Sequence, residues 1–132
     1  RVLFRSEVAA FLTQRAGALR AAGVAQARIV LDYGIGFGKT VEQNFSLLAR
    51  QRELLALGYP LLAGWSRKSS LGAVLARGGE APEPAQRQAA SVAAALLAVE
   101  RGARIVRVHD VRETVDALCV LGHTQSADRP AA

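Results

Sequence analysis

The chain has 132 residues, the length of a single domain, and 51% of them are hydrophobic, which is enough for a packed core. Its formal net charge is +6, but the basic residues are spread along the chain and aromatic residues make up only 5%, which argues against a nucleic-acid-binding surface. No apolar run is long enough to cross a membrane, and a single cysteine excludes an internal disulfide. We therefore expect a cytoplasmic protein that binds neither membranes nor nucleic acid.

The beginning of the chain divides into two parts. Residues Arg1–Ser6 do not lead smoothly into the segment after them and resemble the translated end of a sequencing adapter, so we expect a non-native leader and a natural protein that continues upstream. Over Glu7–Ala22 the apolar residues recur at helical spacing on one face. Gly23 is a natural end for this predicted helix.

Three short apolar runs predict the strands of a sheet, at residues 29–31, 60–64 and 105–108. Helices are predicted between and after them, at residues 41–57, 71–76, 84–101 and 111–121. Thr40 with Gln43, and Asp110 with Glu113, have the spacing of capping boxes at two of these helix starts. Strands that alternate with helices predict an α/β fold with a parallel sheet.

Polar residues follow each predicted strand, and the carboxyl ends of parallel strands share one edge of a sheet. Asp32 follows the first strand, residues 66–69 (Ser-Arg-Lys-Ser) follow the second, and Arg107 and His109 alternate at the end of the third. A carboxylate can accept paired N–H bonds from a flat heterocycle, and the cations can hold an anionic group. The sequence thus predicts a site for an acidic small molecule.

The loop of residues 34–40 imitates two nucleotide-binding motifs without matching either. Its Gly-Lys-Thr end is that of a P-loop, but Tyr33 stands where a P-loop needs its first glycine. Lys39 stands where the dinucleotide fingerprint needs its third glycine. What remains is a flexible glycine-rich turn that lets the backbone approach a ligand.

Three segments resemble the motifs of dihydropteroate synthase, in the order of that family: residues 31–40 (LDYGIGFGKT), 64–69 (GWSRKS) and 107–111 (RVHDV). The resemblance implies an α/β fold that is part of a (β/α)₈ TIM barrel, with about three parallel strands and four to five helices. Residues 7–121 would be the C-terminal part of this pterin-binding barrel, and residues 122–132 a disordered tail.

The family joins 6-hydroxymethyl-7,8-dihydropterin pyrophosphate to p-aminobenzoate in folate biosynthesis, releases pyrophosphate, and is the sulfonamide target. By resemblance, the pterin would be bound by Asp32, Gly64 and Lys68. The p-aminobenzoate would be bound by Phe37, Ser66, Arg67 and Ser69. Pyrophosphate binding would fall to Arg107 and His109, and catalysis to Lys68, Arg107 and His109.

The chain departs from the family in two respects. Tyr33 replaces the usual proline, which would fix φ, so we expect a looser loop and a shifted Asp32. The N-terminal half of the family's barrel, which supplies a metal-binding asparagine, has no counterpart, so Mg²⁺ would belong to the intact enzyme and no metal ligand is assigned here.

The alanine-rich helix predicted at residues 84–101 is apolar on nearly every face, which indicates a buried helix or one divided between core and subunit interface. The resemblance implies a homodimer that pairs through its C-terminal helices.

Two other functions stay open. One is a non-catalytic pterin-binding fragment, and the other is a different pterin-binding barrel such as a methyltetrahydrofolate methyltransferase, against which the motifs at 66–69 and 107–110 argue. Three strands cannot close a barrel, so we expect these residues alone to be inactive and prone to aggregation.

Overall fold

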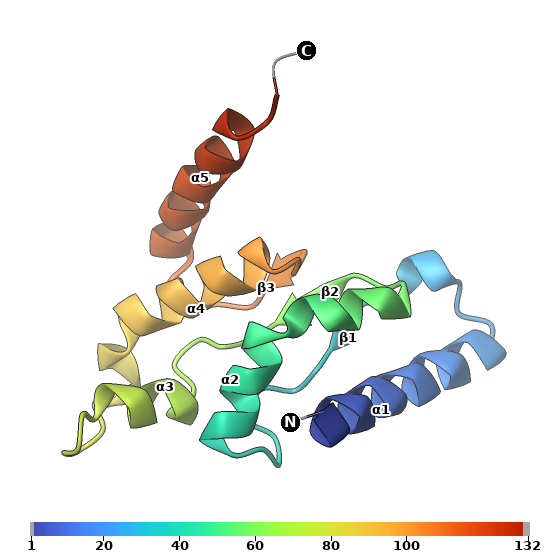
Figure 1. Ribbon diagram of the computed structural model, residues 1–132, viewed down its shortest axis with the longest axis horizontal. Coiled ribbons are helices and arrows are strands. Elements are labelled where there is room, and N and C mark those ends of the chain that lie inside the picture. Colours follow the sequence, from blue (N-terminus) through green and yellow to red (C-terminus); the bar gives the residue numbers. More distant parts are fainter. Residues whose placement is uncertain (1, 131–132) are drawn as a thin grey trace.

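The computed structural model describes residues 2–130, which form one three-stranded sheet and the helices that connect its strands (Figure 1). The strands are β1 (Leu31–Asp32), β2 (Leu61–Ala63) and β3 (Ile105–Val106), in the spatial order β1-β2-β3. Both neighbouring pairs are parallel. The predicted parallel α/β arrangement is confirmed.

Helices precede, connect and follow the strands. They are α1 (Val2–Ala21), α2 (Val41–Ala49), α3 (Ser69–Leu75), α4 (Gln88–Glu100) and α5 (Val111–Ala127), and 3₁₀ segments span Gln26–Arg28, Gln51–Leu57 and Pro84–Gln86. Within the described part of the chain, every helix is too short or too polar to span a bilayer.

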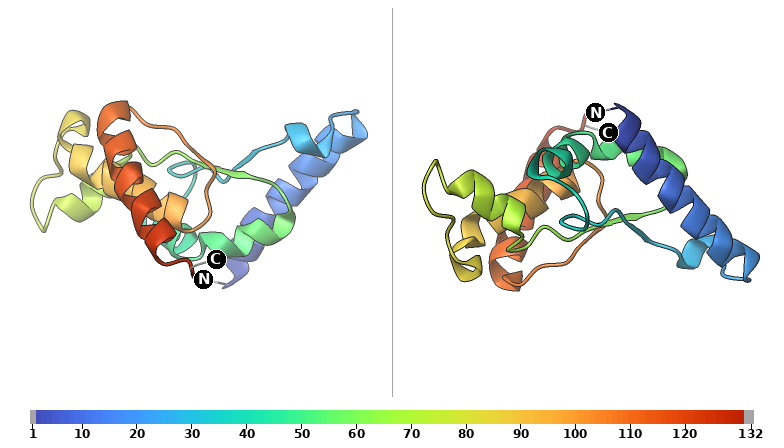
Figure 2. Two further views of the ribbon diagram at one scale, coloured as in Figure 1. Left: turned by 90° about the horizontal axis from the view of Figure 1, so that it is seen from above. Right: turned by 90° about the horizontal axis from the view of Figure 1, so that it is seen from below.

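The two faces of the sheet differ in cover. Leu31 on β1 pairs in register with Leu61 on β2, and both are buried. Figure 2 shows α1 and α2 to one side of the strands, while α4 packs against β3. The neighbouring register row runs through Asp32, Leu62 and Ile105, and Ile105 is 43% exposed. This second face carries apolar side chains in the position that faces the interior of a barrel.

The predicted helix at residues 41–57 is divided, because α2 ends at Ala49 and a 3₁₀ segment follows. Side chains three residues apart lie above one another in a 3₁₀ helix. Gln51 and Leu54 are accordingly both buried, and Leu57 packs against the same core. The tighter winding therefore turns one row of this segment inward.

Two predicted boundaries near the termini are wrong. Helix α1 begins at Val2 rather than Glu7, so part of the expected leader is helical, and Arg1 lies outside the described residues. Helix α5 continues past Leu121 to Ala127, so the first part of the expected disordered tail is helical. Thr124 supports this extension, because its hydroxyl donates to the carbonyl oxygen of Val120 at 2.9 Å. Residues 131–132 lie outside the described range.

The predicted side-chain cap at Asp110 is also wrong. Thr40 caps α2 with a complete capping box, in which its hydroxyl accepts from the Gln43 N–H and the Gln43 side chain accepts in return. Asp110 precedes α5 but its carboxylate makes no capping bond. It accepts instead from Arg67 and Gln88, which lie on other segments.

Candidate active site

An ion pair joins the two outer strands at their carboxyl ends. Asp32 ends β1, Arg107 directly follows β3, and Arg107 Nη1 lies 3.2 Å from Asp32 Oδ2. The other carboxylate oxygen of Asp32 accepts the Gly34 N–H at 2.9 Å. Both side chains of the pair are partly exposed, at 55% for Arg107 and 41% for Asp32, so a ligand can still reach them.

Gly64 leaves room for the guanidinium of this ion pair. It directly follows β2, the middle strand, so the Arg107 side chain must cross it to reach Asp32. A Cβ atom at position 64 would lie 2.3 Å from Arg107 Nη2, which is closer than real contacts allow. The absence of a side chain at position 64 therefore sets the course of Arg107.

His109 lies beside the same strand end and is held by Ser66. Ser66 Oγ lies 2.8 Å from Nδ1 of the His109 ring and accepts the His109 backbone N–H at 3.1 Å. If the Ser66 hydroxyl donates to Nδ1, the proton of the neutral ring sits on Nε2, which can then donate to a ligand. The Ser66 contact thus fixes the orientation of the imidazole.

A hollow of about 160 Å³ brings part of the predicted set together, without Asp32, Phe37, Arg67 or Ser69. It is lined by Gly64, Ser66, Lys68, Arg107, Val108 and His109. The third strand is shorter than predicted, because β3 ends at Val106, and Arg107 and His109 belong to the loop after it. Arg107 and His109 both line this hollow, as does Val108 between them.

The loop after β1 reaches the same region through Lys68. The Lys68 ammonium nitrogen lies 4.6 Å from the centre of the Phe37 ring, a cation–π contact, and Phe37 itself is 68% exposed. Lys39 closes the base of this loop, because its Nζ donates to the carbonyl oxygens of Gly34 at 2.8 Å and Phe37 at 3.1 Å. Burial lowers the pKa of Lys39. The lysine of the Gly-Lys-Thr motif therefore shapes the loop, in agreement with the rejection of a P-loop.

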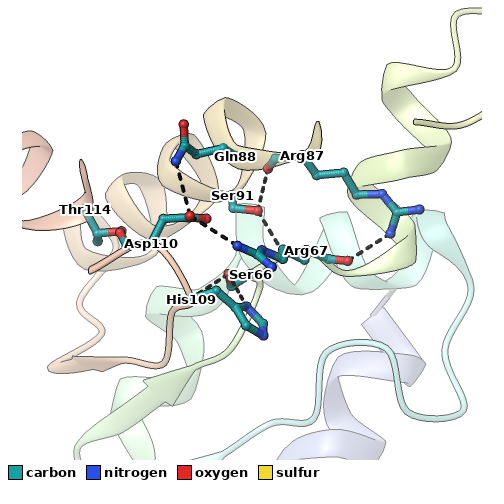
Figure 3. Close-up of polar contacts among 8 residues, drawn as sticks. All are labelled: Ser66, Arg67, Arg87, Gln88, Ser91, His109, Asp110 and Thr114. Atoms are coloured by element: carbon teal, nitrogen blue, oxygen red, sulfur yellow. Dashed lines mark hydrogen bonds and ion pairs between the residues drawn. The ribbon is translucent and has the colours of Figure 1, made fainter. Parts of the chain in front are cut away.

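Arg67 belongs to the loop that follows β2 and connects it to Asp110, in the loop that follows β3 (Figure 3). The Arg67 backbone is left-handed, with φ of 59°. Its N–H donates to Ser91 Oγ on α4, and its carbonyl oxygen accepts from the side chain of Arg87, the residue directly before α4. Its guanidinium contacts Asp110 at 3.3 Å. Hydrogen bonding by Gln88 and then by Arg67 lowers the pKa of Asp110.

Ser69, which was also predicted to bind p-aminobenzoate, begins α3 and is exposed. Sequence reasoning missed Asn44, which is 1% exposed and connects the start of α3 to the glycine-rich loop after β1. Asn44 accepts the Gly36 N–H at 3.2 Å and donates to Ser70 Oγ at 2.8 Å. A polar residue within the apolar pattern of the helix at 41–57 was the available signal.

Tyr33, which was expected to loosen the loop, has its side chain anchored in the core. Tyr33 is 3% exposed, and its hydroxyl donates to Gln51 Oε1 at 2.5 Å. Burial raises the pKa of the Tyr33 phenol well above its ordinary value, so the hydroxyl remains a donor at neutral pH. Tyr33 packs into the same core as Trp65, which is 2% exposed and whose ring centre lies 5.0 Å from that of Phe45.

The residues present do not fit a metal site. Among residues 2–130, no three His, Cys, Asp or Glu side chains gather so that they could hold a metal ion. Asp32, which pairs with the lining residue Arg107, also accepts the Gly34 N–H.

Parallel strands that present charged side chains at their carboxyl ends are typical of α/β proteins that bind a ligand at that edge of the sheet, among them (β/α)-barrels. The chain belongs to the pterin binding enzyme family, whose model matches residues 4–109. A dihydropteroate synthase from Haemophilus influenzae is 45% identical over 121 residues, which cover 92% of this chain and 42% of that relative.

Solved structures agree with the sequence relatives. A dihydropteroate synthase from Stenotrophomonas maltophilia matches with a TM-score of 0.88 and 50% identity, over 97% of this chain and 46% of that one. The Xanthomonas albilineans enzyme in complex with 7,8-dihydropteroate matches with a TM-score of 0.87 and 47% identity, over 95% and 45% of the two chains. The expected family and the expected part of a TIM barrel are confirmed. The chain spans less than half the length of the curated relatives it matches.

Proposed function

We propose that this chain supplies the pterin and pyrophosphate side of a dihydropteroate synthase active site. The enzyme would condense 6-hydroxymethyl-7,8-dihydropterin pyrophosphate with p-aminobenzoate to give 7,8-dihydropteroate and pyrophosphate. One observation carries the proposal: the Asp32–Arg107 ion pair lies at the same sheet edge as a hollow lined by Lys68, Arg107 and His109. The relative solved in complex with 7,8-dihydropteroate supports the proposal, because 7,8-dihydropteroate is the product of this reaction.

The charges of the site suit the two demands of the reaction. The Asp32 carboxylate would accept N–H bonds from the edge of the pterin ring, and such charge-assisted bonds are strong. Lys68 would bond a pterin acceptor and, with Arg107 and His109, stabilise the negative charge that grows on the departing pyrophosphate. The Ser66 contact would keep the His109 ring aimed at that group.

Pyrophosphate would leave first, and the amine of p-aminobenzoate would then attack the electron-poor pterin methylene. This dissociative route requires the substrates to be held in position and needs no covalent enzyme intermediate. We assign p-aminobenzoate binding to Phe37, Ser66, Arg67 and Ser69. Phe37 is exposed beside Lys68 and can cover a flat ring, whereas the Arg67 guanidinium is engaged by Asp110, so that Arg67 would act by shaping the loop.

We assign the Mg²⁺ of the intact enzyme to residues outside this chain, and derive no step through it. We also propose a cytoplasmic enzyme that forms a homodimer through α4 and α5. Helix α5 packs on α4 and exposes a set of large apolar side chains, namely Val111, Val115 and Val120.

Calorimetry with 6-hydroxymethyl-7,8-dihydropterin tests the pterin assignment on the protein encoded at the native locus. We expect Asp32→Asn to weaken binding at least about tenfold, because the charged acceptor is lost. Asp116→Asn, at an exposed acid on α5, is the matched control and should leave binding unchanged. Equal affinity of wild type and Asp32→Asn would reject the assignment, and tight pterin binding without turnover would favour the non-catalytic alternative.

A further inference from the structure

Tyr33 lies between Asp32 and Gly34, two residues that are joined by a hydrogen bond. Asp32 Oδ1 accepts the N–H of Gly34, which closes a short turn with Tyr33 at its centre. Gly34 has a φ of 73°, and its carbonyl is held by the Lys39 ammonium. The conformation of Tyr33 therefore helps decide where the Asp32 carboxylate lies.

The Tyr33 side chain leaves the ligand side and enters the core. Side chains alternate along a strand and its extension, so Asp32 points to the partly exposed face while Tyr33 points to the buried one. There the Tyr33 hydroxyl donates to Gln51 Oε1. Gln51 is fully buried, with 0% exposure, so its amide can only be satisfied by protein groups.

Gln51 connects Tyr33 to the C-terminal end of α4 through hydrogen bonds. Its Nε2 donates to the carbonyl oxygens of Ala98 at 2.9 Å and Arg101 at 3.1 Å. Both donor hydrogens of the amide are thereby used, which leaves Oε1 to accept from Tyr33. A continuous set of hydrogen bonds thus connects the turn at Asp32 to the C-terminal end of α4.

We propose that Tyr33 is a positioning residue for Asp32: its hydroxyl, held by Gln51, fixes the turn that aims the carboxylate at the pterin. In the family, proline at this position restricts φ directly, whereas here a buried side chain supplies the constraint from below. The inference rests on the proposed function, because it gives Asp32 the task of holding a pterin.

The test compares three variants of the protein encoded at the native locus. Tyr33→Phe removes the hydroxyl alone, Tyr33→Pro restores the family residue, and Tyr59→Phe is a control at the other tyrosine of the chain. Three quantities are measured: the Kd for 6-hydroxymethyl-7,8-dihydropterin, the KM for p-aminobenzoate, and the rate of hydrogen exchange at the Gly34 amide.

We expect Tyr33→Phe to weaken pterin binding about tenfold, since small displacements of an anchoring group are costly, while the KM for p-aminobenzoate changes less than about twofold. The Gly34 amide should exchange faster in this variant, because its bond to Asp32 is less well held. Tyr33→Pro should bind pterin with the wild-type Kd, although the hydrogen bond to Gln51 is lost. Tyr59→Phe should match the wild type in all three measurements.

The inference is overturned if Tyr33→Phe binds pterin like the wild type, because the hydroxyl then does not position Asp32. It is also overturned if Tyr33→Pro weakens binding as much as Tyr33→Phe, because a fixed φ at position 33 then does not place the carboxylate. Failure of the wild type to bind pterin would reject the proposed function instead. In that case hydrogen exchange at the Gly34 amide still tests whether the Tyr33 hydroxyl holds the turn. Faster exchange in Tyr33→Phe supports this role, and unchanged exchange overturns it.

Discussion

The Arg107 guanidinium passes directly over Gly64 on its way to Asp32. We expect Gly64→Ala to displace the guanidinium, since the new methyl group would overlap it. The KM for the pterin pyrophosphate should rise about tenfold or more, as expected when a charged contact to the leaving group is lost, with little change for p-aminobenzoate. Steady-state kinetics of the protein encoded at the native locus measures both constants.

Gly17→Ala is the control for this substitution, because a methyl group there meets nothing within 4 Å. It should leave both KM values unchanged and slightly favour α1, since alanine is the better helix former. If Gly64→Ala keeps the wild-type KM for the pterin substrate, the course of Arg107 over Gly64 does not matter for pyrophosphate binding.

The charged residues of the site could be predicted from the sequence, because Asp32, Lys68 and Arg107 follow predicted strands and fall within recognisable motifs. Tyr33 and Gln51 could not. Their roles depend on a hydrogen bond between residues 18 positions apart, and nothing in the local pattern says that a polar pair will meet in the core. From the sequence alone, a tyrosine in place of a proline therefore predicts a looser loop after Asp32.

At the scale of single elements, α2 owes its start to Thr40. We expect Thr40→Ala to lower the free energy of unfolding by about 1 kcal/mol, because the Gln43 N–H loses its acceptor. Urea unfolding followed by circular dichroism gives the difference. Thr13→Ala is a suitable control, since the Thr13 hydroxyl bonds a carbonyl inside α1; an equal loss in both variants would contradict a capping role.

Two capping-box patterns in the sequence had different outcomes, and the reason is tertiary. Thr40 has no competing partner and caps α2, whereas the carboxylate of Asp110 is drawn to Arg67 and Gln88. Local spacing identified both helix starts correctly. The choice between capping and a contact with a distant segment depends on which side chains the fold brings near, and this cannot be derived from spacing.

The molecule as a whole presents apolar side chains on α5 that its own core does not use. If α4 and α5 form the dimer interface, Val115→Asp should convert the dimer to a monomer, because an unpaired charge would be buried between subunits. Sedimentation velocity on the protein encoded at the native locus measures the change.

The control at this scale is Val74→Asp on α3, since Val74 and Val115 are nearly equally exposed, at 51% and 52%. It should leave the oligomeric state unaltered. A dimer that tolerates Val115→Asp as well as Val74→Asp would place the subunit contact elsewhere on the surface.

The chain has a single tryptophan, and this residue lies between Gly64 and Ser66, buried against Phe45. Its emission can therefore follow events at the β2 loop without any added dye. An indole shielded from water emits at shorter wavelength than a solvated one, so ligand capture and loss of structure should shift the spectrum in different ways. Stopped-flow fluorescence could then time the arrival of each substrate in solution.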